Sequence, residues 1–236
     1  MVYTQQHKFY SGVDLHARSM LTHVLDHKGK TVFEEDLPAD PDAFLRAIKP
    51  YRKDLVVGCE CMFAWYWLAD LCEAETIPFA LGHALAMKHI HQGKSNRIDA
   101  GKLAAMLRGG LFPTAYVYPK AKRQTRDLLR RRSFFVRQRG QLLAHIIDTN
   151  AQFNLPTLTK KLTYAGNRSA EIADRFAGPS TRLMIQADLA LIDHYDAQIG
   201  DVERRLVRTA KVDDAVTFGF LRTVPGIGPI LGLILP

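Results

Sequence analysis

The order of β-favouring and helical segments in the first 107 residues constrains the fold of this chain more than any other feature. Strands are predicted over residues 8–14, 19–26 and 31–36, because these segments are rich in apolar and β-favouring residues and an Asp-His-Lys-Gly turn separates the last two. Helices and short apolar strands then alternate. The resulting order, βββαβαβα, predicts an antiparallel meander extended by buried parallel strands.

The alternating part carries its own start and stop signals. Asp40 and Pro41 are the expected N-cap and first residue of a helix that ends at Ile48. Apolar runs and helical periodicity predict the remaining elements. These are a strand over 54–58, a helix over 63–73, a strand over 77–81 and a helix over 97–107.

Three acids lie at the ends of these elements: Asp14, Glu60 and Asp99. The same element order is that of the ribonuclease-H-like fold, in which the first strand, the fourth strand and a late helix bring carboxylates to one edge of the sheet. Two divalent cations held there would support in-line displacement at phosphorus, and Mg²⁺ or Mn²⁺ suits such oxygen ligands. Asn96, one helical turn before Asp99, could add a fourth ligand. The alternatives are a strand-end turn residue at Asp14, a solvent-facing acid at Glu60 and a first-turn acid in the helix dipole at Asp99.

Composition limits the class of protein. The 236 residues are 47% hydrophobic, enough to bury a core, and 32 Lys and Arg against 24 Asp and Glu give a net charge of +8, which favours an anionic polymer as partner. No apolar run reaches the roughly 18 residues of a membrane span and no signal-peptide core is present, so we expect a cytoplasmic protein without a membrane partner. Cys59, Cys61 and Cys72 are too few for a disulfide framework or a usual zinc site, and we expect buried thiols.

A basic, helical region follows Pro119. Apolar pairs recur every seven residues there, and Ile185, Ile192, Ile199 and Leu206 repeat the spacing after Gly178-Pro179. This recurrence predicts two long, coiled-coil-like helices that pack antiparallel or against another subunit. The basic side chains of the first helix cannot all lie on one face, so some are expected to lie beside the apolar stripe and others to meet phosphates. A solvated helix face is the alternative interpretation of these basic residues. They are Lys122, Arg123, Arg126, Arg130, Arg131, Arg132, Arg137 and Arg139.

The segment Val-Pro-Gly-Ile-Gly-Pro at 224–229 matches the hairpin of a helix-hairpin-helix element. Gly226 and Gly228 would permit close approach of the backbone to a phosphate. An ordinary glycine-rich turn between two apolar helices is the other interpretation.

Several motifs taken together carry a family resemblance. They are Tyr-Ser-Gly-Val-Asp-Leu-His, the Cys-Glu segment, Lys-x-x-Arg-Ile-Asp-Ala, and Ala-Tyr-Val-Tyr-Pro followed by Thr-Arg-Asp-Leu-Leu-Arg-Arg-Arg. The chain resembles, over nearly its whole length, the DEDD transposases of the insertion-sequence-110 family. The resemblance implies a RuvC-like domain with an Asp-Glu-Asp-Asp metal cluster, a long coiled-coil linker, and a C-terminal transposase domain with a nucleophilic serine. Some members are recombinases guided by a structured bridge RNA.

The resemblance places the cluster on Asp14, Glu60, Asn96 and Asp99, so an amide stands where the family usually has a third Asp. The chain ends at Pro236, within the helix that should follow the hairpin, and we expect a C-terminally truncated transposase that lacks the serine segment. Strand exchange by this polypeptide alone is therefore not expected. The expected domains are a RuvC-like domain over 1–115, a coiled-coil region over 116–212 and the start of the transposase domain over 213–236.

The leading functional hypothesis is a transposase or site-specific recombinase that binds DNA and a guide RNA and self-associates through the coiled coil. A metal-dependent junction resolvase or nuclease, which would use Asp14, Glu60 and Asp99 without a serine, is the second. A truncated, non-catalytic regulator that binds nucleic acid is the third. An actin-like sugar kinase is disfavoured, because Leu15-His16-Ala17 replaces the glycine-rich phosphate loop that such enzymes need.

Overall fold

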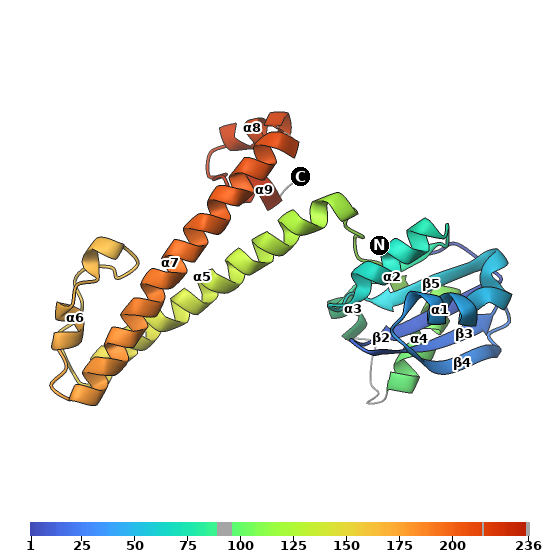
Figure 1. The fold of residues 1–236 in the computed structure, drawn as a ribbon, viewed down its shortest axis with the longest axis horizontal. Coiled ribbons are helices and arrows are strands. Elements are labelled where there is room, and N and C mark those ends of the chain that lie inside the picture. The colour runs from blue at the N-terminus through green and yellow to red at the C-terminus, as the bar shows by residue number, and fades with distance from the viewer. Residues whose placement is uncertain (89–95, 214, 235–236) are drawn as a thin grey trace. The chain divides into compact units, whose positions relative to one another are not determined.

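The computed structural model divides into two compact units, Met1–Lys120 and Ala121–Pro236 (Figure 1). It describes residues 1–88, 96–213 and 215–234, and within these ranges the side chains of residues 88, 96–99, 211–213 and 234 lie outside the description. None of the helices that the structure describes combines the length and apolarity needed to cross a bilayer.

The first unit is built on a five-stranded mixed sheet with the strand order β4-β3-β2-β5-β6. The strands are β2 (Phe9–Leu15), β3 (Ser19–Asp26), β4 (Thr31–Pro38), β5 (Leu55–Glu60) and β6 (Phe79–Gly82). The β2–β3 and β3–β4 pairs are antiparallel, whereas β2–β5 and β5–β6 are parallel. The predicted meander and its parallel extension are thus confirmed, and this mixed α/β arrangement is compatible with a ribonuclease-H-like fold.

Helices cover both faces of the sheet. Helices α1 (Pro41–Ile48) and α2 (Trp65–Ala74) pack on one face, and α4 (Asn96–Arg108) packs on the other. The predicted N-cap is confirmed, because Asp40 Oδ1 accepts a hydrogen bond of 2.9 Å from the Ala43 amide. Four short elements were not predicted: β1 (Val2–Tyr3), which pairs with β7 (Phe112–Pro113), the 3₁₀ turn η1 (Lys49–Asp54) and α3 (Ala84–Lys88).

The helix predicted to start at residue 63 starts at Trp65 instead. A tight turn follows β5, in which the Met62 amide donates to the Glu60 carbonyl over 2.8 Å. This turn directs the chain away from the strand before the helix begins, so Phe63 lies in the connecting loop. Phe63 is consequently exposed in the loop that follows β5.

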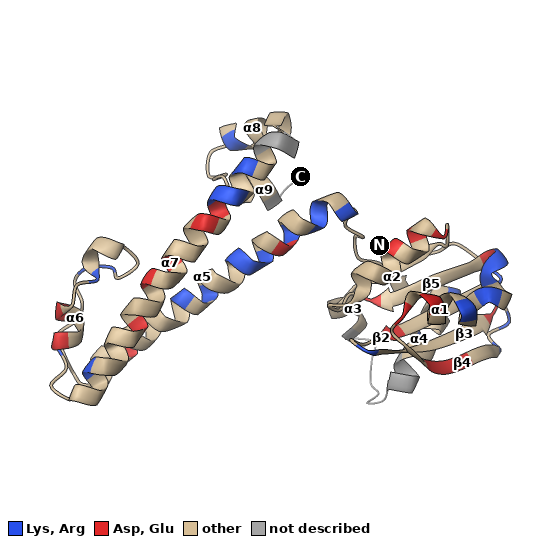
Figure 2. Cartoon of the chain, viewed as in Figure 1, with Lys and Arg blue, Asp and Glu red and all other residues tan. Residues whose placement is uncertain are grey.

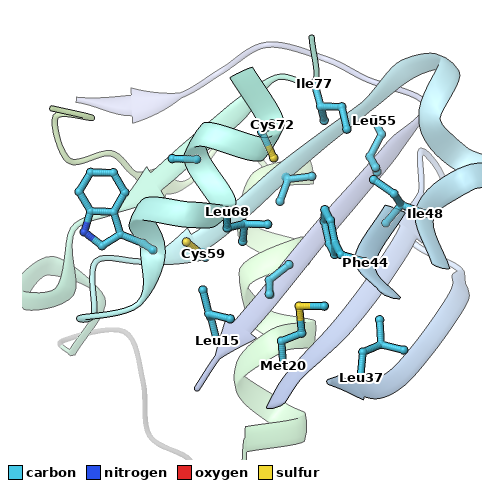
Figure 3. Packing of buried hydrophobic residues seen from close by; sticks show 14 of the residues in the cluster. Leu15, Met20, Leu37, Phe44, Ile48, Leu55, Cys59, Leu68, Cys72 and Ile77 are labelled. Carbon is cyan, nitrogen blue, oxygen red and sulfur yellow. The ribbon is translucent and has the colours of Figure 1, made fainter. Parts of the chain in front are cut away.

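The core between the sheet and helices α1 and α2 is apolar and close-packed. Figure 3 shows Phe44 and Ile48 of α1 and Leu68 and Cys72 of α2 against side chains from β2 to β5. These side chains are almost fully buried. Burial of this extent is the main stabilising contribution to a unit of this size.

A pair of glycines sets how closely α4 approaches the opposite face. Gly12 of β2 and Gly58 of β5 are register partners. A Cβ atom at Gly12 would lie 2.1 Å from the Ala100 carbonyl oxygen, and one at Gly58 would lie 2.7 Å from a Leu107 methyl carbon. The backbone of α4 therefore rests directly on the backbone of β2.

The direction of α4 follows from its two ends. Ala100, near its start, lies over Gly12, whereas Arg108, its last residue, lies 3.1 Å from a Cβ placed on Gly29. Gly29 belongs to the turn between β3 and β4, at the end of the sheet where Phe9 pairs with Asp26. The first turn of α4 is consequently at the opposite end, where β2 and β5 finish.

The second unit is dominated by two long antiparallel helices, α5 (Lys120–Gln152) and α7 (Pro179–Asp213), which lie side by side in Figure 1. Ion pairs join them at sevenfold spacing, with Arg132 to Glu203 at 2.8 Å and Arg139 to Asp196 at 2.5 Å. An apolar cluster around Ile146, Ile185 and Ile192 fills the end near the connection. The predicted antiparallel packing is thus found within the chain.

The remaining elements of the second unit are η2 (Ala165–Asn167), α6 (Glu171–Asp174), α8 (Ala215–Thr223) and α9 (Leu231–Ile234).

A buried arginine ties the connection between α5 and α7 to α7. The side chain of Arg168 is only 1% exposed and pairs with Asp193 at 2.9 Å and with Asp196. It also donates to the Leu162 carbonyl over 2.8 Å. Asp196 of α7 also binds Arg139 of α5, so this one acid links α7 both to α5 and to the segment 153–178 that connects the two helices. A buried guanidinium needs such partners, because an unpaired buried charge is costly.

We predict opposite effects for two glycine-to-alanine substitutions. Gly12→Ala places a methyl group against the Ala100 carbonyl, so it should destabilise the first unit by about 3 kcal/mol or more. Gly140→Ala, in the middle of α5 with nothing within 4 Å of the new methyl group, should stabilise the second unit by about 0.5–1 kcal/mol.

Denaturant unfolding can separate the two effects, because Trp65 and Trp67 both lie in α2 and are the two tryptophans of the chain. Tryptophan fluorescence therefore reports the first unit, and circular dichroism at 222 nm is weighted towards the long helices. An unchanged fluorescence midpoint in Gly12→Ala would contradict the proposed packing of α4 on β2.

Candidate metal centre and nucleic-acid interface

Asp14 and Glu60 lie next to each other at the carboxyl ends of two parallel strands. Each acid is two residues beyond one of the paired glycines, and side chains two apart on a strand share a face of the sheet. Both therefore lie on the α4 side, and both are half-buried. The register pair Val13–Cys59 puts the two acids on adjacent strands at the same level.

The setting of Asp14 is polar. Its Oδ2 atom lies 3.3 Å from His16 Nε2, and its side chain is 22% exposed. Two hard oxygen donors that are close to each other and reachable from solvent fit a Mg²⁺ or Mn²⁺ ion better than a soft metal. The described donor set is therefore chemically suited to the predicted cation.

The other two predicted ligands, Asn96 and Asp99, belong to the first turn of α4, but their side chains lie outside the described residues. Helix α4 starts at the end of the sheet that carries Asp14 and Glu60. Among the side chains that the structure describes, no group of three His, Cys, Asp or Glu residues is placed to hold a metal ion. The described part of the predicted cluster is thus a pair of carboxylates.

The sequence contains a pattern, not identified in the sequence analysis, that predicts the packing of α4 beside Asp14 and Glu60. A glycine stands two residues before each acid, as Gly12-x-Asp14 and Gly58-x-Glu60. The glycines remove the side chains that would hold α4 away from the sheet, and the acids then follow on the same face. Repetition of this spacing on two neighbouring strands predicts a helix seated beside two carboxylates.

The cysteines next to Glu60 have a different environment. Cys59 and Cys72 lie in the core between the sheet and α2, on the face opposite Asp14. Burial raises the pKa of the Cys59 thiol well above its ordinary value and raises the pKa of Cys72 to about 12. Both groups are therefore neutral thiols near pH 7, whereas metal binding uses the thiolate.

The basic run of α5 divides into outward and inward side chains. Lys122, Arg130, Arg131 and Arg137 are exposed, and Arg126 is partly buried. Inward residues are Arg123, which is 6% exposed, and the two arginines paired with α7, Arg132 and Arg139. The predicted phosphate-binding residues thus do not form one surface. That these residues cannot share one face was expected from the sequence. Which of them turn inward could not be predicted, because the acids that bind Arg132 and Arg139 lie 71 and 57 residues away in the chain.

The outward basic residues of α5 have counterparts on α7. Figure 2 shows Lys and Arg along α5 and near the C-terminal end of α7, with Asp and Glu in the middle of α7. The exposed α7 residues are Arg204, Arg205 and Arg208. Sequence analysis had not singled them out. Because the helices are antiparallel, the N-terminal half of α5 and the C-terminal end of α7 form the basic end of the pair.

The turn that contains Gly226 and Gly228 connects α8 to α9. Gly226 has φ +88°, a conformation that favours glycine, and a Cβ atom on either glycine would meet nothing within 4 Å. The Gly232 amide donates to the Gly228 carbonyl over 3.0 Å. The backbone of this turn is therefore open to a partner, as the hairpin interpretation requires.

A comparison with protein families identifies a transposase family. The model of the DEDD transposases of the insertion-sequence-110 family, described as a transposase family, matches residues 11–153. This range begins in β2, includes the positions of Asp14, Glu60, Asn96 and Asp99, and ends just after α5. No curated protein matches the sequence.

We predict that outward and inward arginines of α5 contribute to different properties. Arg130→Ala should lower the slope of log affinity against log salt for duplex DNA by about 0.9, since each phosphate contact contributes about that amount. Arg132→Ala should leave this slope unchanged and lower the stability of the helix pair by up to about 1 kcal/mol, because it removes a partly exposed ion pair with Glu203.

Fluorescence anisotropy at several salt concentrations measures the slope, and denaturant unfolding followed at 222 nm measures stability. If Arg132→Ala reduced the salt slope as much as Arg130→Ala does, the division into outward and inward arginines would be wrong.

Proposed function

Because the chain belongs to the DEDD transposases of the insertion-sequence-110 family, we propose that it acts on DNA through a divalent metal site at one edge of its sheet. The observation that carries the proposal is the placement of Asp14 and Glu60 side by side on the face covered by α4. The first turn of α4, with Asn96 and Asp99, begins at the same edge. A ribonuclease-H-like fold for this unit would account for the meeting of these two strand ends and the start of α4 at one edge of the sheet.

The ligands of the proposed site are Asp14, Glu60 and Asp99, with the amide oxygen of Asn96 as the fourth. Bound Mg²⁺ or Mn²⁺ would activate an attacking oxygen and neutralise charge on the leaving oxygen at phosphorus. The paired strands fix the backbone positions of Asp14 and Glu60 on adjacent strands, so the two carboxylates project from neighbouring points of the sheet edge. His16, 3.3 Å from Asp14, orients that carboxylate.

The second unit is the proposed nucleic-acid-binding region. Lys122, Arg130 and Arg131 of α5 are exposed and would bind phosphates of DNA or of a structured guide RNA. Gly226 and Gly228 offer an open backbone for a further contact. The long helices would also mediate self-association. In this proposal residues 1–115 are the metal domain, 116–212 the helical linker and 213–236 the start of a transposase domain.

A metal-dependent nuclease or junction resolvase is the second candidate. It is favoured by the fact that the two described carboxylates lie within one unit and need no serine to cleave a phosphodiester by water attack. The two candidates differ in their products. Hydrolysis leaves nicked DNA, whereas recombination joins strands of two DNA molecules.

We predict that Asp14→Ala abolishes Mg²⁺-dependent nicking of a four-way DNA junction, because it removes one of two adjacent metal-binding carboxylates. Asp42→Ala is the matched control and should retain wild-type activity. Asp42 is an exposed residue of α1, which packs on the opposite face of the sheet. Gel analysis of a labelled junction measures nicking and also detects recombinant strands.

Equal nicking by wild type and Asp14→Ala would show that the cleavage does not come from this site. Activity that is lost from Asp42→Ala as well would indicate a loss of folding, which tryptophan fluorescence would reveal.

A further inference from the structure

The loop that follows Glu60 presents two large apolar side chains to solvent. Phe63 is 73% exposed and Met62 is 52% exposed. Single exposed apolar side chains are common on protein surfaces, so the feature that distinguishes these two is their position directly after Glu60 in the chain. Met62 and Phe63 are called the Met-Phe tip below.

The Met-Phe tip is held outward by anchors on both sides. Before it, the Cys61 amide donates to the Gly82 carbonyl over 2.9 Å, and the Met62 amide donates to the Glu60 carbonyl over 2.8 Å. After it, Trp65 starts α2 and is only 2% exposed. A short loop fixed at both ends gives Phe63 little freedom to fold back, so its exposure is built into the fold.

The tip lies close to the carboxylate pair. Two residues separate Phe63 from Glu60, and the three backbone steps between their Cα atoms span at most about 10 Å. That is about three steps of 3.4 Å along a stacked nucleic-acid strand. A nucleotide next to a phosphate held at Asp14 and Glu60 is therefore within reach of the Phe63 ring.

We infer that Phe63, supported by Met62, stacks on an unpaired nucleobase adjacent to the phosphate that a divalent cation would hold at Asp14 and Glu60. This inference rests on the proposed function. An aromatic ring stacks on any base, because every base has a π-face, so the tip selects unpaired or splayed nucleotides rather than a sequence. Two side chains are too few for a stable protein interface, which buries about 800 Å² on each partner.

The test uses forked DNA with 2-aminopurine at the first unpaired nucleotide, titrated with the full chain in buffer containing Ca²⁺. The wild-type chain should quench 2-aminopurine fluorescence. Phe63→Ala should abolish quenching and weaken binding to the fork about 5- to 150-fold, as expected for loss of one base–aromatic stack. Phe63→Trp should restore both properties, whereas Phe63→Leu should not restore quenching.

Leu111→Ala is the matched control. Leu111 is 68% exposed in the same unit, but it follows the C-terminal end of α4, away from the carboxylates. This variant should bind and quench as the wild type does. Wild-type quenching and affinity in Phe63→Ala would overturn the inference. So would Phe63-dependent self-association in sedimentation with unchanged fork binding, which would assign the tip to a protein contact.

The outcome is separable from that of the proposed function. Phe63-dependent quenching together with equal nicking by wild type and Asp14→Ala would uphold stacking and reject the metal-dependent chemistry. Absence of any fork binding by the wild-type chain would overturn both.

Discussion

The contact between the α4 backbone and Gly12 is the interaction on which the candidate site depends. Any side chain at Gly12 would collide with the Ala100 carbonyl, so α4 can approach β2 this closely only over glycine. The close approach brings the start of α4 to the edge where Asp14 and Glu60 stand on adjacent strands. Sheet register and helix packing, rather than the acids alone, thus determine which oxygens can share a cation.

The second unit shows a different constraint: an arginine that forms an ion pair within the unit is less available to bind a phosphate. The inward arginines Arg132 and Arg139 neutralise acids of α7, and Arg168 does the same from the connection. Arginines used in this way stabilise the helix pair and are poorly placed for phosphates. The outward residues of α5 and Arg205 and Arg208 of α7 are exposed, whereas the exposed Arg204 pairs with Asp201. A basic sequence is therefore a poor measure of the size of a nucleic-acid interface.

Much of the secondary structure in both units could be predicted, because its signals are local. Strand periodicity, the Asp40 N-cap and the sevenfold spacing of Ile185 and Ile192 depend on neighbouring residues only. Contacts between distant segments could not be read in this way. The Arg132–Glu203 pair and the burial of Arg168 depend on how α7 returns along α5. The placement of Phe63 in a helix was wrong, because the turn at Glu60 outweighs the helical pattern. The ligand roles of Asp14, Glu60, Asn96 and Asp99 stay predictions.

The central claim is that Asp14 and Glu60 together hold a divalent cation. Calorimetric titration of the full chain with Mn²⁺ tests it most directly, with the Asp14→Asn and Glu60→Gln variants compared with Asp42→Asn. The account predicts that the wild-type chain and Asp42→Asn bind Mn²⁺ alike and that each of the other two variants loses this binding. Undiminished Mn²⁺ binding by Asp14→Asn and Glu60→Gln would contradict it.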